Sequence, residues 1–428
     1  MFTRLLLLLA LTFPAFAGPL EDYVSKPDSA FSWKVVSSIQ TNGMTVARLE
    51  MTSQQWREHT WKHSMVIVTP PVVRNRDHAF MFITGSGQGL QYISMLATIA
   101  ERAGCIAGCL TDVPNQPLYG GKKEDALIAY TFSEYLKSKD PTWPLLFPMA
   151  KSAVRGLDTL AAFGAETKAA TPTKFIVSGA SKRGWTTWLT AATDKRVVAI
   201  APMVIDVLNM SEQVNWQRKV YGRDSEQIKD YTERGLTDVF TNPEMSELRG
   251  LIDPYSYRAR YTMPKLIMLG SNDPYWTVDA LRFYWNDLPG QKLIHQTANA
   301  GHDLNGGKEA IPTLATWTQM VADGEKLPEM KWTFADGKPA KLAMEAGQPI
   351  NRGLYWSATS TNRDFRKSAW TSRPLTADGN KLSAEGTAPD GGWSAGMIHA
   401  EFTSKRGNKA WFSTEARVTP DDPKPEGK

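Results

Sequence analysis

The sequence predicts an α/β fold followed by an all-β region, and three observations support this. Between residues 79 and 322, short apolar runs alternate with longer stretches of helical pattern, which predicts a mostly parallel sheet with helices on both faces. The alternation pauses at residues 206–260, a polar stretch that contains Trp and Tyr and has a helical pattern. From residue 327 onwards the pattern becomes one of short strands separated by turns. We therefore expect a doubly wound sheet with a helical insertion, followed by a β-sandwich.

The first strands are expected to be antiparallel, because their residues alternate and β-branched types are frequent. They span residues 33–39, 44–52 and 63–69. The later strands are short apolar runs, which span residues 79–84, 105–110, 174–178, 197–205, 265–270 and 292–296. The helices expected between them span residues 90–102, 123–137, 145–163, 182–193, 278–287 and 308–322.

The C-terminal strands are separated by turn signals such as Asp336-Gly337 and Asp390-Gly391. These strands are expected at residues 331–335, 341–345, 353–358, 397–403 and 409–418. The pattern predicts one domain at residues 18–326, with its insertion at 206–260, and a β-sandwich domain at 327–419. Residues 420–428 are rich in Pro and charge, which predicts a flexible tail.

Composition excludes several classes of protein. The 428 residues are too many for one compact core, which favours two domains. Hydrophobic residues make up 42% and charged residues 22%, so a largely disordered chain is excluded. The net charge of +5 is small for this length and no long basic run occurs, which argues against nucleic acid as the main partner.

Residues 1–17 have the pattern of a secretory signal peptide. A short basic start containing Arg4 precedes an apolar stretch at 5–13, and small residues at Ala15 and Ala17 suit cleavage after Ala17. The apolar stretch is too short to span a bilayer, and no later stretch approaches the ~20 apolar residues that a spanning helix needs. We expect a periplasmic or secreted protein without an integral membrane segment after signal removal.

The two cysteines, Cys105 and Cys109, leave two interpretations open. They could pair in an oxidising compartment, or they could be buried thiols of the strand at 105–110. No metal site is expected, because His59 and His63 lack the His-Glu-x-x-His context and lie in a strand-like pattern. No cofactor is expected either, since the glycine-rich stretch at 85–89 does not have dinucleotide-binding spacing.

The strongest local signal for chemistry is a serine between a strand and a helix. The strand at 174–178 leads into Gly179-Ala180-Ser181, and a helix follows at once. This is the context of a nucleophile elbow, where small neighbours permit a sharp turn and the helix N-terminus offers N–H donors to an oxyanion. The sequence departs from the usual motif, because Arg183 stands where a second Gly is expected and Gly184 comes one residue later. The alternative is a plain helix cap by Ser181.

An acid and a base follow the serine in the order that α/β-hydrolases use. Asp273 comes just after the strand at 265–270, and His302 lies in a loop after the strand at 292–296. We therefore expect Ser181 to be the nucleophile, His302 the general base and Asp273 the residue that orients it. Asp279 and Asp303 are alternative candidates for the acid.

Two loops are expected to complete the site. Residues 85–88 follow a strand at the place of the second oxyanion loop, so the N–H groups of Lys182 and Ser86 are the expected oxyanion donors. Gln88 in this loop, and Asn115 and Gln116 after the strand at 105–110, are expected to bind substrate. The insertion at 206–260 is expected to cover the site as a lid. A plain turn and a packing role are the alternatives for these segments.

Several motifs together resemble the PhoPQ-activated pathogenicity-related protein family. They are the Ser181 turn, Asp253-Pro254-Tyr255, Met263-Pro264-Lys265, Asn272-Asp273, Leu288-Pro289-Gly290, Asn299-Ala300-Gly301-His302, residues 113–117 and residues 362–366. The resemblance implies an exported α/β-hydrolase-like protein with a C-terminal β domain, linked to two-component regulation of virulence. The Ser-Lys-Arg-Gly turn is also similar to the Ser-Arg-x-Gly turn of glucuronoyl esterases, in which a basic residue after the serine assists the oxyanion. Lys182 holds that place here, although it lacks the bidentate fork of Arg.

Two functions are compatible with these patterns. The first is a serine hydrolase, in particular an esterase acting on a small-molecule or a peptide- or glycan-linked ester, with a serine peptidase as its variant. The second is a catalytically inactive protein of the same fold that binds an envelope component, because a fold does not by itself establish an activity.

Overall fold

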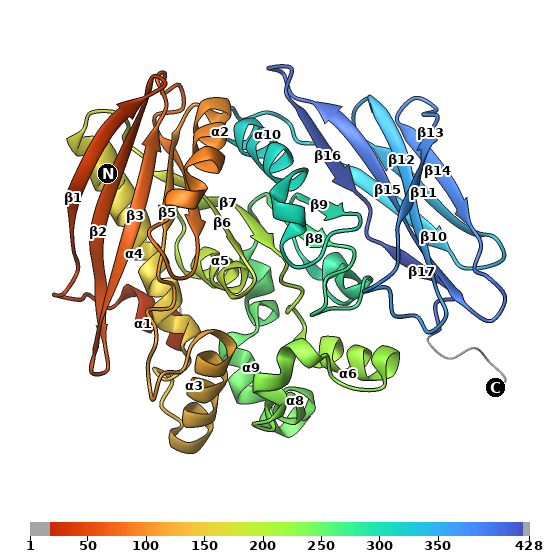
Figure 1. The fold of residues 1–428 in the computed structure, drawn as a ribbon, viewed down its shortest axis with the longest axis horizontal. Helices are drawn as coiled ribbons and strands as arrows, with labels where there is room; N and C mark the ends of the chain where they lie inside the picture. Colours follow the sequence, from red (N-terminus) through yellow and green to blue (C-terminus); the bar gives the residue numbers. More distant parts are fainter. Residues whose placement is uncertain (1–17, 423–428) are drawn as a thin grey trace, which may run out of the picture.

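The computed structural model describes residues 18–422 (Figure 1). The predicted signal peptide at 1–17 and residues 423–428 of the predicted tail lie outside the described residues. None of the helices formed by residues 18–422 combines the length and the apolar character needed to cross a bilayer.

The central sheet begins antiparallel and continues parallel, as predicted. Its strands lie in the order β1-β2-β3-β5-β4-β6-β7-β8-β9, and every neighbouring pair from β5 to β9 is parallel. The strands are β1 (Ser32–Thr41), β2 (Met44–Trp56), β3 (His59–Thr69), β4 (His78–Ile83), β5 (Ile106–Leu110), β6 (Lys174–Ala180), β7 (Val197–Met203), β8 (Lys265–Gly270) and β9 (Lys292–Thr297). This doubly wound sheet confirms the predicted α/β-hydrolase class.

Helices cover both faces of the sheet. Successive residues of a strand point to opposite faces, so each central strand contributes apolar side chains to two cores. On β6, for example, Val177 belongs to the core beneath one set of helices and Ile176 to the core beneath the other. The first set is α1 (Pro19–Ser25), α3 (Glu124–Ser138), α4 (Leu146–Glu166) and α5 (Lys182–Thr193). The second set is α2 (Ile93–Ala103), which follows a short 3-10 turn η1 (Leu90–Tyr92), and α10 (Ala310–Ala322).

The segment between β7 and β8 is the predicted helical insertion, and it consists of short helices. They are α6 (Met210–Tyr221), η2 (Glu226–Ile228), α7 (Lys229–Thr232), α8 (Leu236–Thr241), η3 (Pro243–Met245), α9 (Ser246–Ile252) and η4 (Pro254–Arg260). Figure 1 shows α6, α8 and α9 together at the lower edge of the molecule, with α3 beside α8 and α9.

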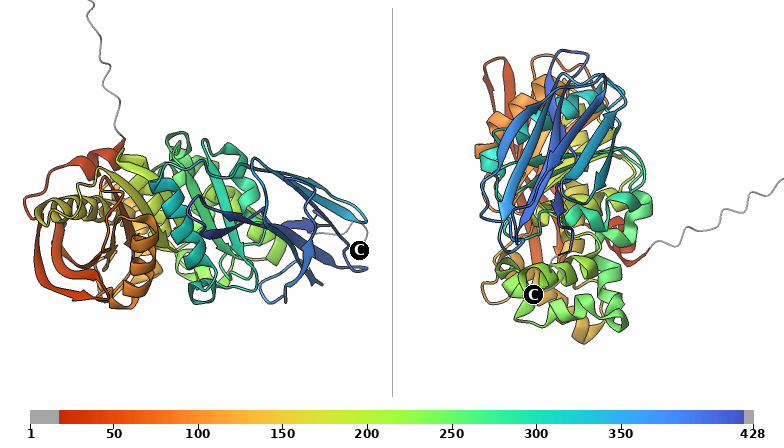
Figure 2. Two further views of the ribbon diagram at one scale, coloured as in Figure 1. Left: turned by 90° about the horizontal axis from the view of Figure 1, so that it is seen from above. Right: turned by 90° about the vertical axis from the view of Figure 1, so that its right-hand side faces the viewer.

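The C-terminal strands form two antiparallel sheets, as expected for a sandwich. One contains β10 (Met330–Ala335), β11 (Ala340–Ala346) and β14 (Lys381–Gly386). The other contains β12 (Arg352–Ser360), β13 (Thr371–Leu375), β15 (Trp393–Thr403), β16 (Lys409–Ser413) and β17 (Arg417–Thr419), and it joins the central sheet where Ser413 pairs with Ile294 of β9. Figure 2 shows these strands at the opposite end of the elongated molecule from β1–β3. Because the sheets are continuous, the domain boundary at residue 327 stays a prediction.

One predicted helix is not formed, and the structure decides between the two interpretations of the cysteines. The helix predicted at 278–287 is wrong: two 3-10 turns, η5 (Ala280–Phe283) and η6 (Trp285–Asp287), replace it. Tyr284 separates them with an extended φ of −148°, and its hydroxyl group donates a hydrogen bond to the buried Asp206, so a tertiary contact overrides the helical pattern. Cys105 and Cys109 are buried thiols without a disulfide, and burial raises the pKa of Cys105 to about 12.

Candidate active site

Ser181 has the backbone geometry of a nucleophile elbow. It joins the end of β6 to the start of α5 with φ 57° and ψ −130°, a combination that non-glycine residues rarely adopt. Gly179 makes this turn possible, because a Cβ atom there would lie 2.6 Å from the carbonyl oxygen of Arg183. A strained serine at a strand-to-helix turn is the arrangement that exposes a nucleophilic Oγ in this fold.

The displaced second glycine is explained by the packing of α5. A Cβ atom on Gly184 would lie 2.6 Å from Cγ2 of Ile205 and 3.0 Å from the carbonyl oxygen of Met203, so Gly184 permits the close approach of α5 to the chain after β7. Arg183 occupies the usual glycine position but directs its guanidinium group away from this contact. The guanidinium group forms a bidentate pair with Glu124, with both N–O distances at 2.7 Å.

The structure brings Asp273 and His302 into direct contact. His302 Nδ1 lies 2.8 Å from Asp273 Oδ2, and the other carboxylate oxygen accepts the backbone N–H of Tyr275 at 2.9 Å. The rings of His302 and Tyr275 are stacked, with centroids 4.3 Å apart. The imidazole is therefore fixed on two sides, while its Nε2 is buried and has no hydrogen-bond partner among residues 18–422.

The alternative acids have other partners. Asp279 is buried and pairs with Arg363 at 2.9 Å and Arg282 at 3.2 Å. Asp303 accepts the backbone N–H of Asn305 at the start of the 3-10 turn η7 (Leu304–Gly307). Of the three aspartates considered, Asp273 is the one that contacts His302.

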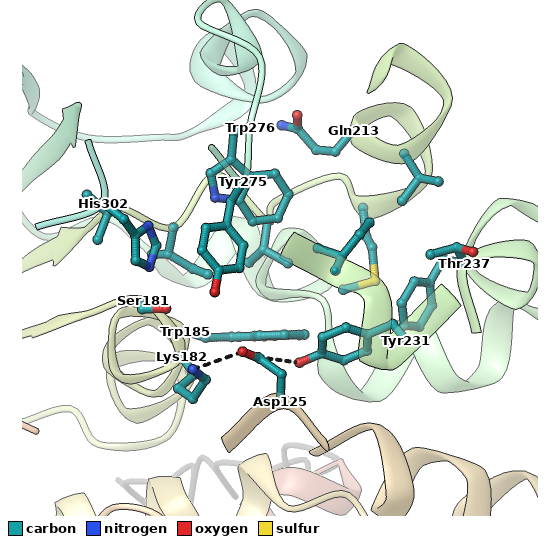
Figure 3. Close-up of a pocket in the computed structure, with 17 residues that line it drawn as sticks. Asp125, Ser181, Lys182, Trp185, Gln213, Tyr231, Thr237, Tyr275, Trp276 and His302 are labelled. Carbon is teal, nitrogen blue, oxygen red and sulfur yellow. Dashed lines mark hydrogen bonds and ion pairs between the residues drawn. The ribbon is translucent and has the colours of Figure 1, made fainter. Parts of the chain in front are cut away.

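Ser181 and His302 line one pocket, which has a cavity volume of about 60 Å³ and is partly open to solvent. Figure 3 shows both residues at one end of the pocket and Tyr231 and Thr237 at the other, with the ring of Trp185 between them. No hydrogen bond joins Ser181 to His302 within the described structure, and such contacts are often loose without substrate. The insertion forms much of the wall, through Val207, Met210, Gln213, Val214, Ile228, Tyr231, Thr237 and Phe240.

A cluster of four charges lies beside the nucleophile. Lys182 Nζ is 3.0 Å from a carboxylate oxygen of Glu124 and 3.0 Å from one of Asp125, and Asp125 also accepts the hydroxyl group of Tyr231 at 3.0 Å. Burial raises the pKa of Glu124, but its bonds to Arg183 and Lys182 have the larger combined effect and lower it to about 2. Two carboxylates and two cations therefore compensate each other at this edge of the pocket.

The predicted substrate-binding side chains do not line this pocket. Gln116 donates to Ser86 Oγ at 3.2 Å and to Glu124, so it contacts the loop after β4 and the charge cluster. Gln88 accepts a hydrogen bond from Arg48, and Asn115 donates to the carbonyl oxygen of Lys62. Their binding role, and the role of the Ser86 N–H group, stay predictions.

Sequence reasoning missed residues that shape the pocket. Tyr275 stacks on His302 and Asp125 binds Lys182, yet neither belongs to a motif. The one sequence signal that could have indicated Tyr275 was its position two residues after Asp273. Asp125 and Trp185 lie on helices whose pattern indicates only packing.

Comparison with known proteins identifies the family. The model of the family described as "PhoPQ-activated pathogenicity-related protein" matches residues 20–366. A curated relative, the Autocrine proliferation repressor protein A of Dictyostelium discoideum, is 32% identical over 439 residues, covering 93% of this chain and 88% of the relative.

Three solved structures with partial similarity share low sequence identity with this chain. Acetyl xylan esterase 1 from Thermoanaerobacterium sp. has a TM-score of 0.48 and 16% identity, covering 71% of this chain and 91% of that one. An S-formylglutathione hydrolase from Agrobacterium tumefaciens has a TM-score of 0.48 and 12% identity, covering 67% and 98%. A glucuronoyl esterase from Solibacter usitatus has a TM-score of 0.43 and 10% identity, covering 71% and 91%. On the family match and the full-length relative, the chain belongs to the PhoPQ-activated pathogenicity-related protein family.

Proposed function

We propose that this protein is an exported serine hydrolase that cleaves esters through Ser181, His302 and Asp273. The observation that carries the proposal is the 2.8 Å contact between His302 Nδ1 and Asp273 Oδ2 at a pocket that Ser181 also lines. The strained backbone of Ser181 supports the same assignment, because strain of this kind concentrates at functional sites.

The proposed reaction has two steps. Ser181 Oγ attacks the ester carbonyl carbon while His302 Nε2 takes the hydroxyl proton, and Asp273 stabilises the resulting imidazolium. The tetrahedral intermediate collapses, and the alcohol leaves with the proton from His302. A water molecule then attacks the acyl-serine with the help of His302, which releases the acid and restores Ser181.

The oxyanion is proposed to bind to backbone N–H groups rather than to a charged side chain. The N–H of Lys182 lies at the N-terminus of α5, where the helix dipole favours negative charge. The ammonium group of Lys182 is already engaged by Glu124 and Asp125, which makes the side chain a poor free counter-charge. The N–H of Ser86, in the loop after β4, is the proposed second donor.

The proposed setting is outside the cytoplasm. The pattern of residues 1–17 supports export to the periplasm or the medium, and the family description, which refers to pathogenicity, supports a virulence function. The substrate would be a small-molecule ester or an ester linked to a peptide or glycan.

A second candidate is a catalytically inactive binding protein of the envelope. It is favoured by the lack of a hydrogen bond between Ser181 and His302 in the described structure, and by the name of the curated relative, which describes a repressor of proliferation. A serine peptidase using the same triad is the variant of the first candidate.

A fluorophosphonate probe separates the two candidates. The chain from residue 18 onwards is treated with the probe beside Ser181→Ala, His302→Ala and a control, Ser178→Ala, whose hydroxyl group in β6 bonds the carbonyl oxygen of Ala201. We expect labelling of the native and control proteins and none of the other two. Absence of labelling in a folded native protein would support the binding protein instead, and labelling of Ser181→Ala would contradict Ser181 as the nucleophile.

A further inference from the structure

The pocket beside Ser181 is walled mainly by apolar and aromatic side chains. Five aromatic residues contribute to it, from α5, from the insertion and from the chain after Asp273: Trp185, Tyr231, Phe240, Tyr275 and Trp276. Of these, Trp185, Tyr231 and Phe240 are buried in the same hydrophobic core as the insertion. A preformed wall of this kind favours an apolar ligand group, since burial removes its surface from water.

The pocket has no uncompensated charge for a charged ligand group. Lys182 is the one Lys or Arg that lines it, and its ammonium group is within 3.0 Å of both Glu124 and Asp125. Asp125 is the one carboxylate that lines it, and it is held by Lys182 and by the Tyr231 hydroxyl group. A carboxylate or ammonium group of a substrate would be desolvated here without a free partner, which is costly.

The other polar side chains at the pocket offer few free groups: Gln213 is engaged, and Trp276 Nε1 is a buried donor without a hydrogen-bond partner among residues 18–422. Gln213 donates through Nε2 to the carbonyl oxygens of Leu208 and Ala280. The pocket is therefore poorly equipped to recognise the hydroxyl groups of a sugar ring, which need several free donors and acceptors.

We propose that the site takes esters that carry an uncharged apolar group larger than methyl, either an aliphatic chain or a single aromatic ring. This proposal rests on the proposed function and specifies its substrate. The group lies against Trp185 and beneath the insertion, next to the carbonyl carbon that Ser181 attacks. Acetylated sugars and esters of uronic acids are poor substrates, because their distinguishing groups find no partner in the pocket.

Two series of neutral esters test the size of the group and the side on which it lies. The first varies the acyl group in p-nitrophenyl acetate, butyrate and hexanoate, and the second varies the alcohol in methyl, butyl and benzyl acetate. Burial of each additional methylene group should raise kcat/KM by about fourfold. From the smallest to the next member of one series, kcat/KM should therefore rise roughly tenfold or more. The series that shows the rise identifies the side of the ester that enters the pocket.

Pairs of charged and neutral esters of similar shape test whether the substrate group in the pocket must be uncharged. Mono-p-nitrophenyl succinate is compared with p-nitrophenyl pentanoate, and acetylcholine with 3,3-dimethylbutyl acetate. We expect each charged ester to be at least roughly tenfold slower in kcat/KM than its neutral partner.

Two substitutions connect the preference to this pocket. Val214→Phe fills the pocket from α6 and should abolish the rise with chain length, whereas Phe240→Leu enlarges it and should move the optimum to longer chains. The matched control is Val72→Phe, at a side chain that is 60% exposed and does not line the pocket. Val72→Phe should leave the dependence of kcat/KM on chain length unchanged.

The outcomes distinguish this proposal from the one on which it rests. Labelling by the fluorophosphonate probe would leave the hydrolase in place, but the substrate class would be overturned if p-nitrophenyl acetate and methyl acetate were the fastest members of their series, or if the succinate or choline ester were faster than its neutral partner. A chain-length preference that persists in a folded Val214→Phe would place the group elsewhere. A folded protein without labelling would overturn the hydrolase and the substrate class together.

Discussion

Asn299 and Trp370 exchange two hydrogen bonds across the junction between the α/β and C-terminal parts of the chain. Asn299 Nδ2 donates to the carbonyl oxygen of Trp370 at 2.9 Å, and the N–H of Trp370 donates to Asn299 Oδ1 at 2.7 Å. Asn299 lies three residues before His302 in the loop after β9. The loop after β8 is held in the same way, because Asn272, next to Asp273, donates to the carbonyl oxygen of Ser368 at 2.8 Å.

The two loops are also joined to each other. The N–H of Asn299 donates to Ser271 Oγ at 2.9 Å, and that hydroxyl group donates to Asn272 Oδ1 at 2.6 Å. The C-terminal residues 365–370 therefore support both loops that carry the proposed base and its acid. This gives the C-terminal strands a positioning role in addition to any binding role.

Asn299→Gly tests this role. Asn299 has a φ of 56°, which glycine adopts without strain, so the substitution removes two hydrogen bonds while keeping the backbone path. We expect the free energy of unfolding to fall by about 2 kcal/mol. We expect kcat for an ester to fall by roughly ten- to a hundredfold, since small displacements of reacting groups are costly, with KM changed much less.

The control for this variant is Asn42→Gly. Asn42 has a φ of 50° in the turn between β1 and β2, so it reports the cost of the Asn-to-Gly change alone. Equal kcat values for the two variants would contradict the positioning role, even if their stabilities differ.

Asp273→Asn tests the assignment of the acid. The amide of Asn can donate to His302 Nδ1, which would place the imidazole proton on Nε2 and prevent it from accepting the proton of Ser181. We expect kcat to fall by about 10⁴-fold with little loss of stability. Asp303→Asn is the matched control, because the Asp303 carboxylate accepts the backbone N–H of Asn305 and forms no hydrogen bond with the His302 ring within residues 18–422. A comparable loss of kcat in both variants would argue against Asp273 as the orienting residue.

The order of the proposed triad could be predicted because each member follows its own strand. Parallel strands gather their carboxyl ends at one edge of the sheet, so Ser181 after β6, Asp273 after β8 and His302 after β9 had to come near each other. The strand-helix alternation predicted the sheet for a similarly local reason, since buried apolar runs are legible in the sequence.

The features that could not be predicted from the sequence depend on contacts between segments that are distant along the chain. The sequence did not indicate that Gln116 contacts Glu124 and Ser86, and its expected role in substrate binding stays a prediction. The helix expected at 278–287 is broken at Tyr284 by a bond to Asp206, which lies 78 positions away along the chain. No pattern within one segment encodes partners of this kind, nor the contribution of residues 365–370 to the site.

Gly184→Ala tests the account of the displaced glycine. The new methyl group would approach Ile205 Cγ2 to 2.6 Å and two carbonyl oxygens to 3.0 Å, so α5 must shift. We expect a loss of about 1–3 kcal/mol in the free energy of unfolding, and reduced labelling of Ser181 by the fluorophosphonate probe. Gly250→Ala is the control: it lies in α9 with no atom within 4 Å of the new methyl group, and it should stabilise the protein by about 0.4–1 kcal/mol. Native stability and labelling in Gly184→Ala would show that the glycine is not required.

Asp206→Asn tests the electrostatic state of the chain just after β7. Asp206 is buried, and its Oδ1 accepts the hydroxyl group of Tyr284 at 2.5 Å. Burial raises the pKa of Asp206 to about 7, with a further increase from Asp273 and Asp279 and a partial decrease from the Tyr284 hydrogen bond.

The direction of the pH effect follows from this raised pKa. Between about pH 4 and pH 7 the folded state holds a proton on Asp206 that the unfolded chain has lost, so the free energy of unfolding should fall as pH rises through this range. The fall should amount to at most about 4 kcal/mol from this group. Asparagine can still accept the Tyr284 hydroxyl but carries no charge, so Asp206→Asn should flatten the dependence and stabilise the protein at pH 8. Denaturant unfolding across this range measures the effect, with the exposed Asp378→Asn as the control that keeps the native slope. A native slope in Asp206→Asn would mean that the carboxyl group is ionised in the folded protein and that Tyr284 compensates for its burial.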